Sequence, residues 1–201
     1  MLIIPELETV VLQPPRTGST SLRDAVLKRY PHAFTPYRHM ERDGIPVGYD
    51  RWKTICIVRH PADRLASLYR YMKRFSSTTS IACEAWKRRM SEDVDRPFAE
   101  WLWESHEIFT DPVNHDGTFI PRYAVRHPMP IARKSLWRWA RPDLGPVDLL
   151  KLEDASAIEA RLDVSLERSN ASKDCATAEV CASVAEFLAF LHSWDMSLYA
   201  D

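Results

Sequence analysis

The chain has 201 residues, of which 45% are hydrophobic and 27% charged, and its formal net charge is −1. This length predicts a single domain over residues 1–201, with enough apolar residues for a sizeable core. The near-zero net charge gives no electrostatic reason to expect nucleic acid as a partner, so any anion site must come from a local cluster of Arg and Lys.

Cysteine spacing and the N-terminal residues help to predict the cellular compartment of the protein. The four cysteines form no C-x-x-C pair, which argues against a zinc site or a redox dithiol and favours a reduced intracellular protein. Residues 1–15 lack the basic start and apolar core of a signal peptide. No segment approaches the roughly 18 apolar residues of a membrane span. We therefore expect a soluble, cytoplasmic protein.

The first predicted unit is a strand, a loop and a helix. Residues 9–13 are mostly apolar and β-branched, which is typical of a buried strand. Pro14 and Pro15 cannot continue it, because proline donates no ladder hydrogen bond. Apolar residues at helical spacing then predict a helix over residues 20–28, with hydroxyl side chains at its start.

A second unit of the same kind follows a loop over residues 30–50, which is punctuated by Pro and Gly. Residues 54–58 are apolar on both faces, as in a central strand of a parallel sheet. Arg59, His60 and Pro61 end this strand, and the spacing of apolar residues predicts a helix over 62–75.

The remaining pattern continues the alternation of strands and helices. It predicts helices over 81–90, 98–108, 155–162 and 178–199, a loop over 109–130 and a third core strand over 147–152. Such an alternation indicates a three-layer, P-loop-like α/β fold with a central parallel sheet flanked by helices.

Polar residues gather where the first two strands end, which is where α/β folds bind ligands. Residues 15–21 offer a Gly for close backbone approach, several hydroxyls, a cation and a helix N-terminus, all of which favour a phosphate. Arg59 and, two helical turns later, Ser67 can hold a second phosphate. A Walker loop needs G-x-x-x-x-G-K-[ST], and this segment has one Gly and no Lys, which disfavours ATP.

These residues carry a resemblance to a family. P-R-T-G-S-T-S-L over residues 15–22 resembles the 5′-phosphosulfate loop of sulfotransferases that use PAPS (3′-phosphoadenosine 5′-phosphosulfate), usually P-K-x-G-[ST]-[ST]-x-L. Residues 58–69 resemble their 3′-phosphate motif, V-R-N-P-x-x-R-x-x-S-x-Y. Residues 150–154 and 193–199 are similar to the later L-x-Y-E-D and D-x-x-L-Y motifs. The matches follow the family's order over nearly the whole chain, and the carbohydrate branch is nearer.

The resemblance implies an enzyme that transfers a sulfuryl group from PAPS to a hydroxyl of a carbohydrate or small molecule, leaving PAP (3′-phosphoadenosine 5′-phosphate), without a metal. Thr20 and Ser21 would hold the 5′-phosphate, and Arg59 and Ser67 the 3′-phosphate. Arg16 would serve catalysis at the leaving group, although the family usually has Lys there. The implied nucleotide-binding residues are Arg16, Thr17, Gly18, Ser19, Thr20, Ser21, Arg59 and Ser67.

The catalytic base is expected between the two phosphate motifs. Related carbohydrate sulfotransferases place a catalytic His in this region, which points to His39, because an imidazole with a pKa near neutrality suits removal of a hydroxyl proton. Glu41 is the second candidate, since some family members use Glu, and His32 is the third.

Two other functions compete with the enzyme. The first is a binding module of the same fold that keeps PAPS or PAP but has little or no turnover, which the Lys-to-Arg change at Arg16 favours. The second is a small-molecule kinase, which the missing Walker Lys disfavours. The sequence leaves the acceptor and the oligomeric state open.

Overall fold

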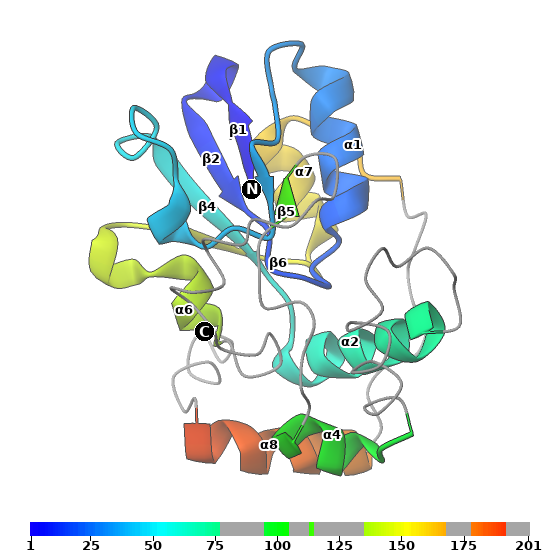
Figure 1. The fold of residues 1–201 in the computed structure, drawn as a ribbon. Coiled ribbons are helices and arrows are strands. Elements are labelled where there is room, and N and C mark those ends of the chain that lie inside the picture. The colour runs from blue at the N-terminus through cyan, green and yellow to red at the C-terminus, as the bar shows by residue number, and fades with distance from the viewer. Residues whose placement is uncertain (77–94, 105–112, 115–134, 168–177, 192–201) are drawn as a thin grey trace. The chain divides into compact units, whose positions relative to one another are not determined.

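The structure is a computed structural model, which describes residues 1–76, 95–104, 113–114, 135–167 and 178–191 (Figure 1). The chain divides into two compact units. The first comprises Met1–Arg59, Asp111–Tyr123 and Leu136–Ala171, and the second comprises His60–Thr110, Ala124–Ser135 and Ser172–Asp201. The single domain stays a prediction, because compactness does not decide whether the units fold independently.

A four-stranded sheet forms the centre of the first unit, in the order β1 (Leu2–Ile4), β2 (Thr9–Leu12), β4 (Lys53–Val58), β6 (Asp148–Lys151). The three predicted core strands are confirmed, and they run parallel to one another. The predicted parallel sheet is confirmed for these three strands only, and the whole sheet is mixed, because the edge strand β1 is antiparallel to β2. Only the short turn η1 (Pro5–Leu7) joins these two strands, and a short connection can join only antiparallel neighbours.

Helices cover both faces of this sheet. α1 (Ser19–Arg29) and α7 (Ala155–Leu162) pack on one face, where Val26 and Ile158 share a buried cluster with Ile55 and Ile57 of β4. Cys56 and Val58 alternate with these residues and are buried as well, so the other face is covered too. α6 (Leu136–Ala140), which the sequence did not predict, packs against β4 (Figure 1). The α/β class is thereby confirmed.

Short elements complete the first unit. β3 (Tyr37–Arg38) pairs with β5 (Val113–Asn114) in a second, two-stranded sheet, so part of the predicted 109–130 loop is a strand. η2 (Arg42–Gly44) and η4 (Pro142–Leu144) are single 3-10 turns. The buried Arg42 joins them, because its Nη1 donates to the carbonyls of Arg141 at 3.0 Å and Gly145 at 2.7 Å.

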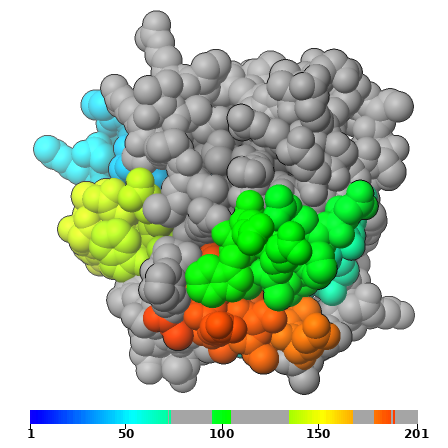
Figure 2. All heavy atoms as spheres, turned by 60° about the horizontal axis from the view of Figure 1, so that its bottom comes forward, coloured from blue at the N-terminus to red at the C-terminus, as the bar shows by residue number. Residues whose placement is uncertain are grey.

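Three helices form the described part of the second unit: α2 (Pro61–Ser76), α4 (Phe98–Glu104) and α8 (Ala178–Leu191). The Tyr69 ring lies 5.4 Å from that of Phe98 and 5.3 Å from that of Trp101, centroid to centroid. The Trp103 and Phe187 rings are 5.1 Å apart, and α4 and α8 lie side by side (Figure 2). The predicted helix over 81–90 and the closing motif over 193–199 lie outside the described residues. None of the helices described is both long and apolar enough to span a bilayer.

Val11→Ala is expected to destabilise the protein by about 2 kcal/mol, because it removes two methyl groups from the core under α1. Val11 is fully buried in β2. Val47→Ala is the matched control, because Val47 is 99% exposed in a surface turn. Urea unfolding of both variants measures the difference, and equal stabilities would contradict this description of the core.

Candidate functional site

The loop between β2 and α1 is closed by its own side chains. Thr17 is 1% exposed, and its Oγ1 donates to the carbonyl of Pro14 at 2.7 Å. Gln13, also buried, donates from Nε2 to the carbonyl of Ser19 at 3.3 Å. The hydroxyl of Thr17 therefore holds the loop, so any role of this residue in nucleotide binding falls to its backbone N–H.

In this loop, residues with left-handed backbone alternate with residues of negative φ. Arg16 has a φ of 70° and Gly18 a φ of 72°, whereas Thr17 between them and Ser19 after them are not left-handed. Successive residues of alternating hand turn their N–H groups into one concavity, which is the backbone arrangement that binds phosphate in nests. A left-handed Arg is uncommon, so the loop holds a specific conformation.

The N-terminus of α1 opens onto the same loop. Gly18 is its N-cap and contributes no side-chain hydrogen bond, and the first turn carries no acidic residue. Ser19 and Ser21 are half-buried and Thr20 is exposed. Because the first four N–H groups of a helix have no intrahelical acceptor, this end combines donors, hydroxyls and the positive end of the helix dipole.

Gly18 is fixed by a close contact with the third strand of the parallel set. A Cβ at Gly18 would lie 2.7 Å from Cδ1 of Leu152, which follows β6. Leu152 in turn donates its N–H to the carbonyl of Val58 at 2.8 Å. Only glycine satisfies both this contact and the left-handed φ, so the loop rests directly on the end of the sheet.

Arg59 stands at the end of the neighbouring strand β4. It is half-buried, and its Nη1 donates to the carbonyl of Arg16 at 3.3 Å. The structure thus brings Arg59 and the loop together, as parallel neighbours β2 and β4 should. Ser67 belongs to the second unit, where it is 2% exposed in α2. Its pairing with Arg59 stays a prediction.

His39 is held beside the loop by its ring. It follows β3 directly, is half-buried and has a φ of 53°. Its Nδ1 lies 3.2 Å from the carbonyl oxygen of Gln13. Because a carbonyl oxygen only accepts, the proton of the neutral ring belongs on Nδ1, which leaves Nε2 as an unprotonated acceptor.

The surroundings of His39 keep its ring neutral. Burial lowers the pKa of His39 to about 4, against the raising effect of the Gln13 hydrogen bond, and the nearby charges of the α-amino group, Arg38 and Arg23 lower it further. At neutral pH the imidazole is therefore unprotonated and able to accept a proton.

The two other candidate bases make contacts elsewhere. Glu41 is 1% exposed, and its Oε2 lies 4.0 Å from Nε of Arg138 in α6. His32 is exposed beyond the far end of α1, where its backbone N–H bonds Oε1 of Glu6 at 2.9 Å. The 11 residues of α1 span about 16 Å. Of the three, His39 is the candidate that touches the strand end carrying the loop.

Four further residues of this site were not predicted. Gln13 and Leu152 support the loop and His39, and Arg23 and Arg38 charge the surroundings of His39. A polar Gln at the end of an otherwise apolar buried strand was the available signal. Within the described residues, no group of three or more His, Cys, Asp or Glu side chains is arranged to hold a metal ion.

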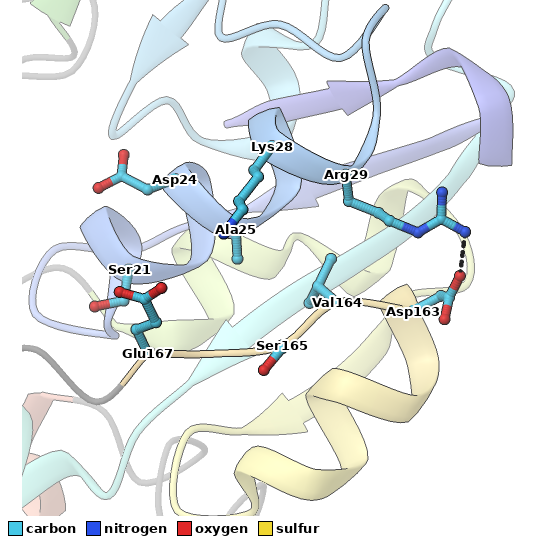
Figure 3. A pocket seen from close by; sticks show the side chains of 9 residues that line it. All are labelled: Ser21, Asp24, Ala25, Lys28, Arg29, Asp163, Val164, Ser165 and Glu167. Atoms are coloured by element: carbon cyan, nitrogen blue, oxygen red, sulfur yellow. Dashed lines mark hydrogen bonds and ion pairs between the residues drawn. The ribbon is translucent and has the colours of Figure 1, made fainter.

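A groove of about 440 Å³ runs along α1 (Figure 3). Ser21 and Glu167 lie at one end and the Arg29–Asp163 ion pair, 2.6 Å long, at the other. Ala25 and Val164 contribute apolar surface between them. Ser21 belongs both to the start of α1 and to the groove, so the two features adjoin.

Gly18→Ala is expected to destabilise the protein by about 2–3 kcal/mol, because it combines backbone strain with the Leu152 contact. Gly48→Ala is the matched control: Gly48 also has a positive φ, of 98°, but a Cβ there meets nothing within 4 Å. The control is expected to lose only the strain, about 1 kcal/mol. Urea unfolding measures both, and equal losses would show that Leu152 does not confine the loop.

The pKa of His39 makes stability depend on pH. Its folded pKa of about 4 lies below the ordinary value of 6.5, so between these values the unfolded chain binds the proton and the folded chain does not. Stability should therefore rise from pH 4 to pH 6.5, and the contribution of His39 should be constant above that. His39→Gln should reduce this slope, as measured by thermal unfolding across this range.

Comparisons of the chain with protein-family models, with curated proteins and with solved structures each found no match. The candidate site is therefore characterised by its own geometry. Three features define it: a loop of alternating hand at a helix N-terminus, Arg59 at the adjacent strand end, and a neutral His39 anchored to the residue that begins the loop.

Proposed function

We propose that the protein is a PAPS-dependent sulfotransferase acting on a hydroxyl acceptor, with a P-loop-like nucleotide site. One observation carries the proposal: Gln13 joins the β2–α1 loop and the His39 imidazole at a single strand end, through its contacts with Ser19 and His39. Sulfuryl transfer needs such a pair, because it requires charge stabilisation on the donor side and removal of a proton from the acceptor.

The loop residues fit the phosphosulfate of PAPS. The backbone N–H groups from Gly18 onward and the hydroxyls of Ser19, Thr20 and Ser21 provide neutral donors without competing carboxylates in the first helical turn. Arg16 supplies a cation at the loop. Because such donors act where charge develops on a leaving phosphate, this end of α1 would stabilise the departing 5′-phosphate.

His39 would take the proton of the acceptor on Nε2, while Gln13 keeps the other ring nitrogen protonated. PAPS supplies the sulfuryl group, whose bond to the 5′-phosphate oxygen breaks as the bond to the acceptor oxygen forms. His39 holds the released proton, and Arg16 with the loop N–H groups holds the negative charge on the leaving side. The proton and the charge are thus balanced within the site.

The 3′-phosphate separates PAPS from ATP, and Arg59 is the residue proposed to bind it. Arg59 already reaches the loop, through the carbonyl of Arg16. Ser67 is the proposed second ligand. A guanidinium bound to phosphate by charge-assisted hydrogen bonds gives both affinity and selectivity for the additional phosphate.

A binding module with little turnover remains the second candidate. The low pKa of His39 favours it, because a base with a pKa of about 4 removes a hydroxyl proton weakly unless a ligand raises that pKa. Arg16 in place of the usual Lys also favours the binding module. A small-molecule kinase is the third candidate. It is disfavoured because the loop of this chain has no Lys of the kind that a Walker motif requires.

Calorimetric titration with PAP and with ADP tests the nucleotide site. PAP is expected to bind at least about tenfold more tightly than ADP, because only PAP carries the 3′-phosphate. Arg59→Ala should weaken PAP binding by at least about tenfold. Arg51→Ala is the control, since Arg51 is an exposed residue that precedes β4 at the opposite end of the strand. Equal affinities for PAP and ADP would exclude both the sulfotransferase and the binding module.

Transfer of labelled sulfate from PAPS to a mixed library of hydroxyl acceptors then distinguishes the enzyme from the binder. His39→Ala should keep PAP affinity and abolish transfer. A protein that binds PAP but transfers no sulfate is the binding module. Full transfer by the His39→Ala variant would remove His39 from the mechanism and return the role to Glu41 or His32.

A further inference from the structure

Arg59 contacts the backbone of the β2–α1 loop from its position at the end of β4. Its Nη1 donates to the carbonyl oxygen of Arg16 at 3.3 Å, and both residues are half-buried. They are 43 positions apart in the sequence and belong to the same compact unit. A hydrogen bond from a charged donor is stronger than a neutral one, and partial burial strengthens it further. This contact therefore constrains the direction of the Arg16 carbonyl.

The backbone of Arg16 has a conformation that needs such support. Its φ of 70° lies in the left-handed region, where the Cβ of an L-residue crowds the following carbonyl oxygen. Strained residues persist when the surrounding structure holds them. The Thr17 hydroxyl, which bonds the Pro14 carbonyl, and the contact between Gly18 and Leu152 hold the rest of the loop. The bond from Arg59 acts on the carbonyl of the strained residue itself.

Fixing the carbonyl of Arg16 also fixes the N–H of Thr17. The peptide bond between these residues is trans, so its C=O and N–H groups point in opposite directions. With the carbonyl turned toward Arg59, the Thr17 N–H points away from that guanidinium and belongs to the N–H groups that the alternating backbone turns into one concavity. If this peptide turned over, a carbonyl oxygen would replace a donor there and would repel a phosphate.

We propose, on the basis of the proposed function, that Arg59 is a positioning residue for the 5′-phosphate of the donor in addition to its proposed contact with the 3′-phosphate. The two roles are compatible, because a guanidinium carries five N–H donors in a fixed fork. Arg59 holds the Thr17 N–H toward the 5′-phosphate through the carbonyl of Arg16, and it binds the 3′-phosphate directly. One side chain thereby links the two phosphate sites.

The test compares PAP with AMP, which differ only in the 3′-phosphate. Each nucleotide is titrated by calorimetry into the wild-type protein, Arg59→Ala and Arg59→Met, the last of which keeps the unbranched stem of the side chain. Both variants are expected to bind AMP about fivefold more weakly, which is the effect of one hydrogen bond, and to lose more affinity for PAP. Arg51→Ala is the control, since Arg51 is exposed at the opposite end of β4, and should bind both nucleotides as the wild type does.

An NMR measurement on the nucleotide-free protein follows the contact itself. The resonance of the Arg16 carbonyl carbon responds to its hydrogen bond, and the Thr17 amide resonance responds to the direction of the peptide. Arg59→Ala and Arg59→Met are expected to shift both resonances, and Arg51→Ala should leave them in place. This measurement distinguishes a positioned loop from a charge that attracts AMP through space, because the charge alone requires no change at Arg16.

Three results would overturn the proposal while the proposed function still stands. AMP affinity equal to that of the wild type in both Arg59 variants limits this residue to the 3′-phosphate. Weaker AMP binding with unchanged Arg16 and Thr17 resonances shows that only the charge acts. A wild-type protein that binds PAP but not AMP has a loop that does not hold a 5′-phosphate by itself.

Other results separate the proposed function from the role of Arg59. If the wild-type protein binds PAP and AMP equally, the proposed function fails. Weaker AMP binding by the two Arg59 variants, with shifted Arg16 and Thr17 resonances, would then still support the positioning role. If the wild-type protein binds neither nucleotide, both proposals fail.

Discussion

The parallel pairing of β2 with β4 is the constraint on which the rest of the site depends. Leu12 pairs with Cys56 in this register, so the chain leaves both strands at the same edge of the sheet. The loop at Arg16 and the guanidinium of Arg59 meet there, and the pairing of β4 with β6 adds Leu152 below Gly18. Each of these residues follows the end of a strand, and each contact joins residues that are far apart in the sequence.

The parts predicted from sequence are those with strong local signals. The three core strands are apolar runs bounded by Pro or polar residues, and apolar residues at helical spacing predicted α1 and α7. The predicted hydroxyl cap of α1 was wrong, because its N-cap is Gly18 and has no side-chain hydrogen bond. Asp154 caps α7 by accepting from the N–H of Ala157 at 3.0 Å. β1 was missed because its three residues are too short for a periodic pattern. α6 was missed because its five residues are too few for a periodic pattern, although Ser135 precedes it; its Leu136 and Trp139 are buried.

The site was predictable in its residues more than in its geometry. The loop and Arg59 follow from their positions after strands. The anchoring of His39 does not, because it depends on a left-handed backbone at a non-glycine residue and on a contact with Gln13, 26 positions away. Strained backbone of this kind is common at functional sites and is maintained by surrounding contacts.

The contact between His39 and Gln13 has a consequence for how this site can change. Because the ring is attached to the residue that begins the loop, the imidazole follows any displacement of the end of β2. The spacing between base and loop is then conserved while the strand shifts as a whole. Substitutions in the core beneath β2 could therefore change the depth of the site, because His39 and the β2–α1 loop would move together.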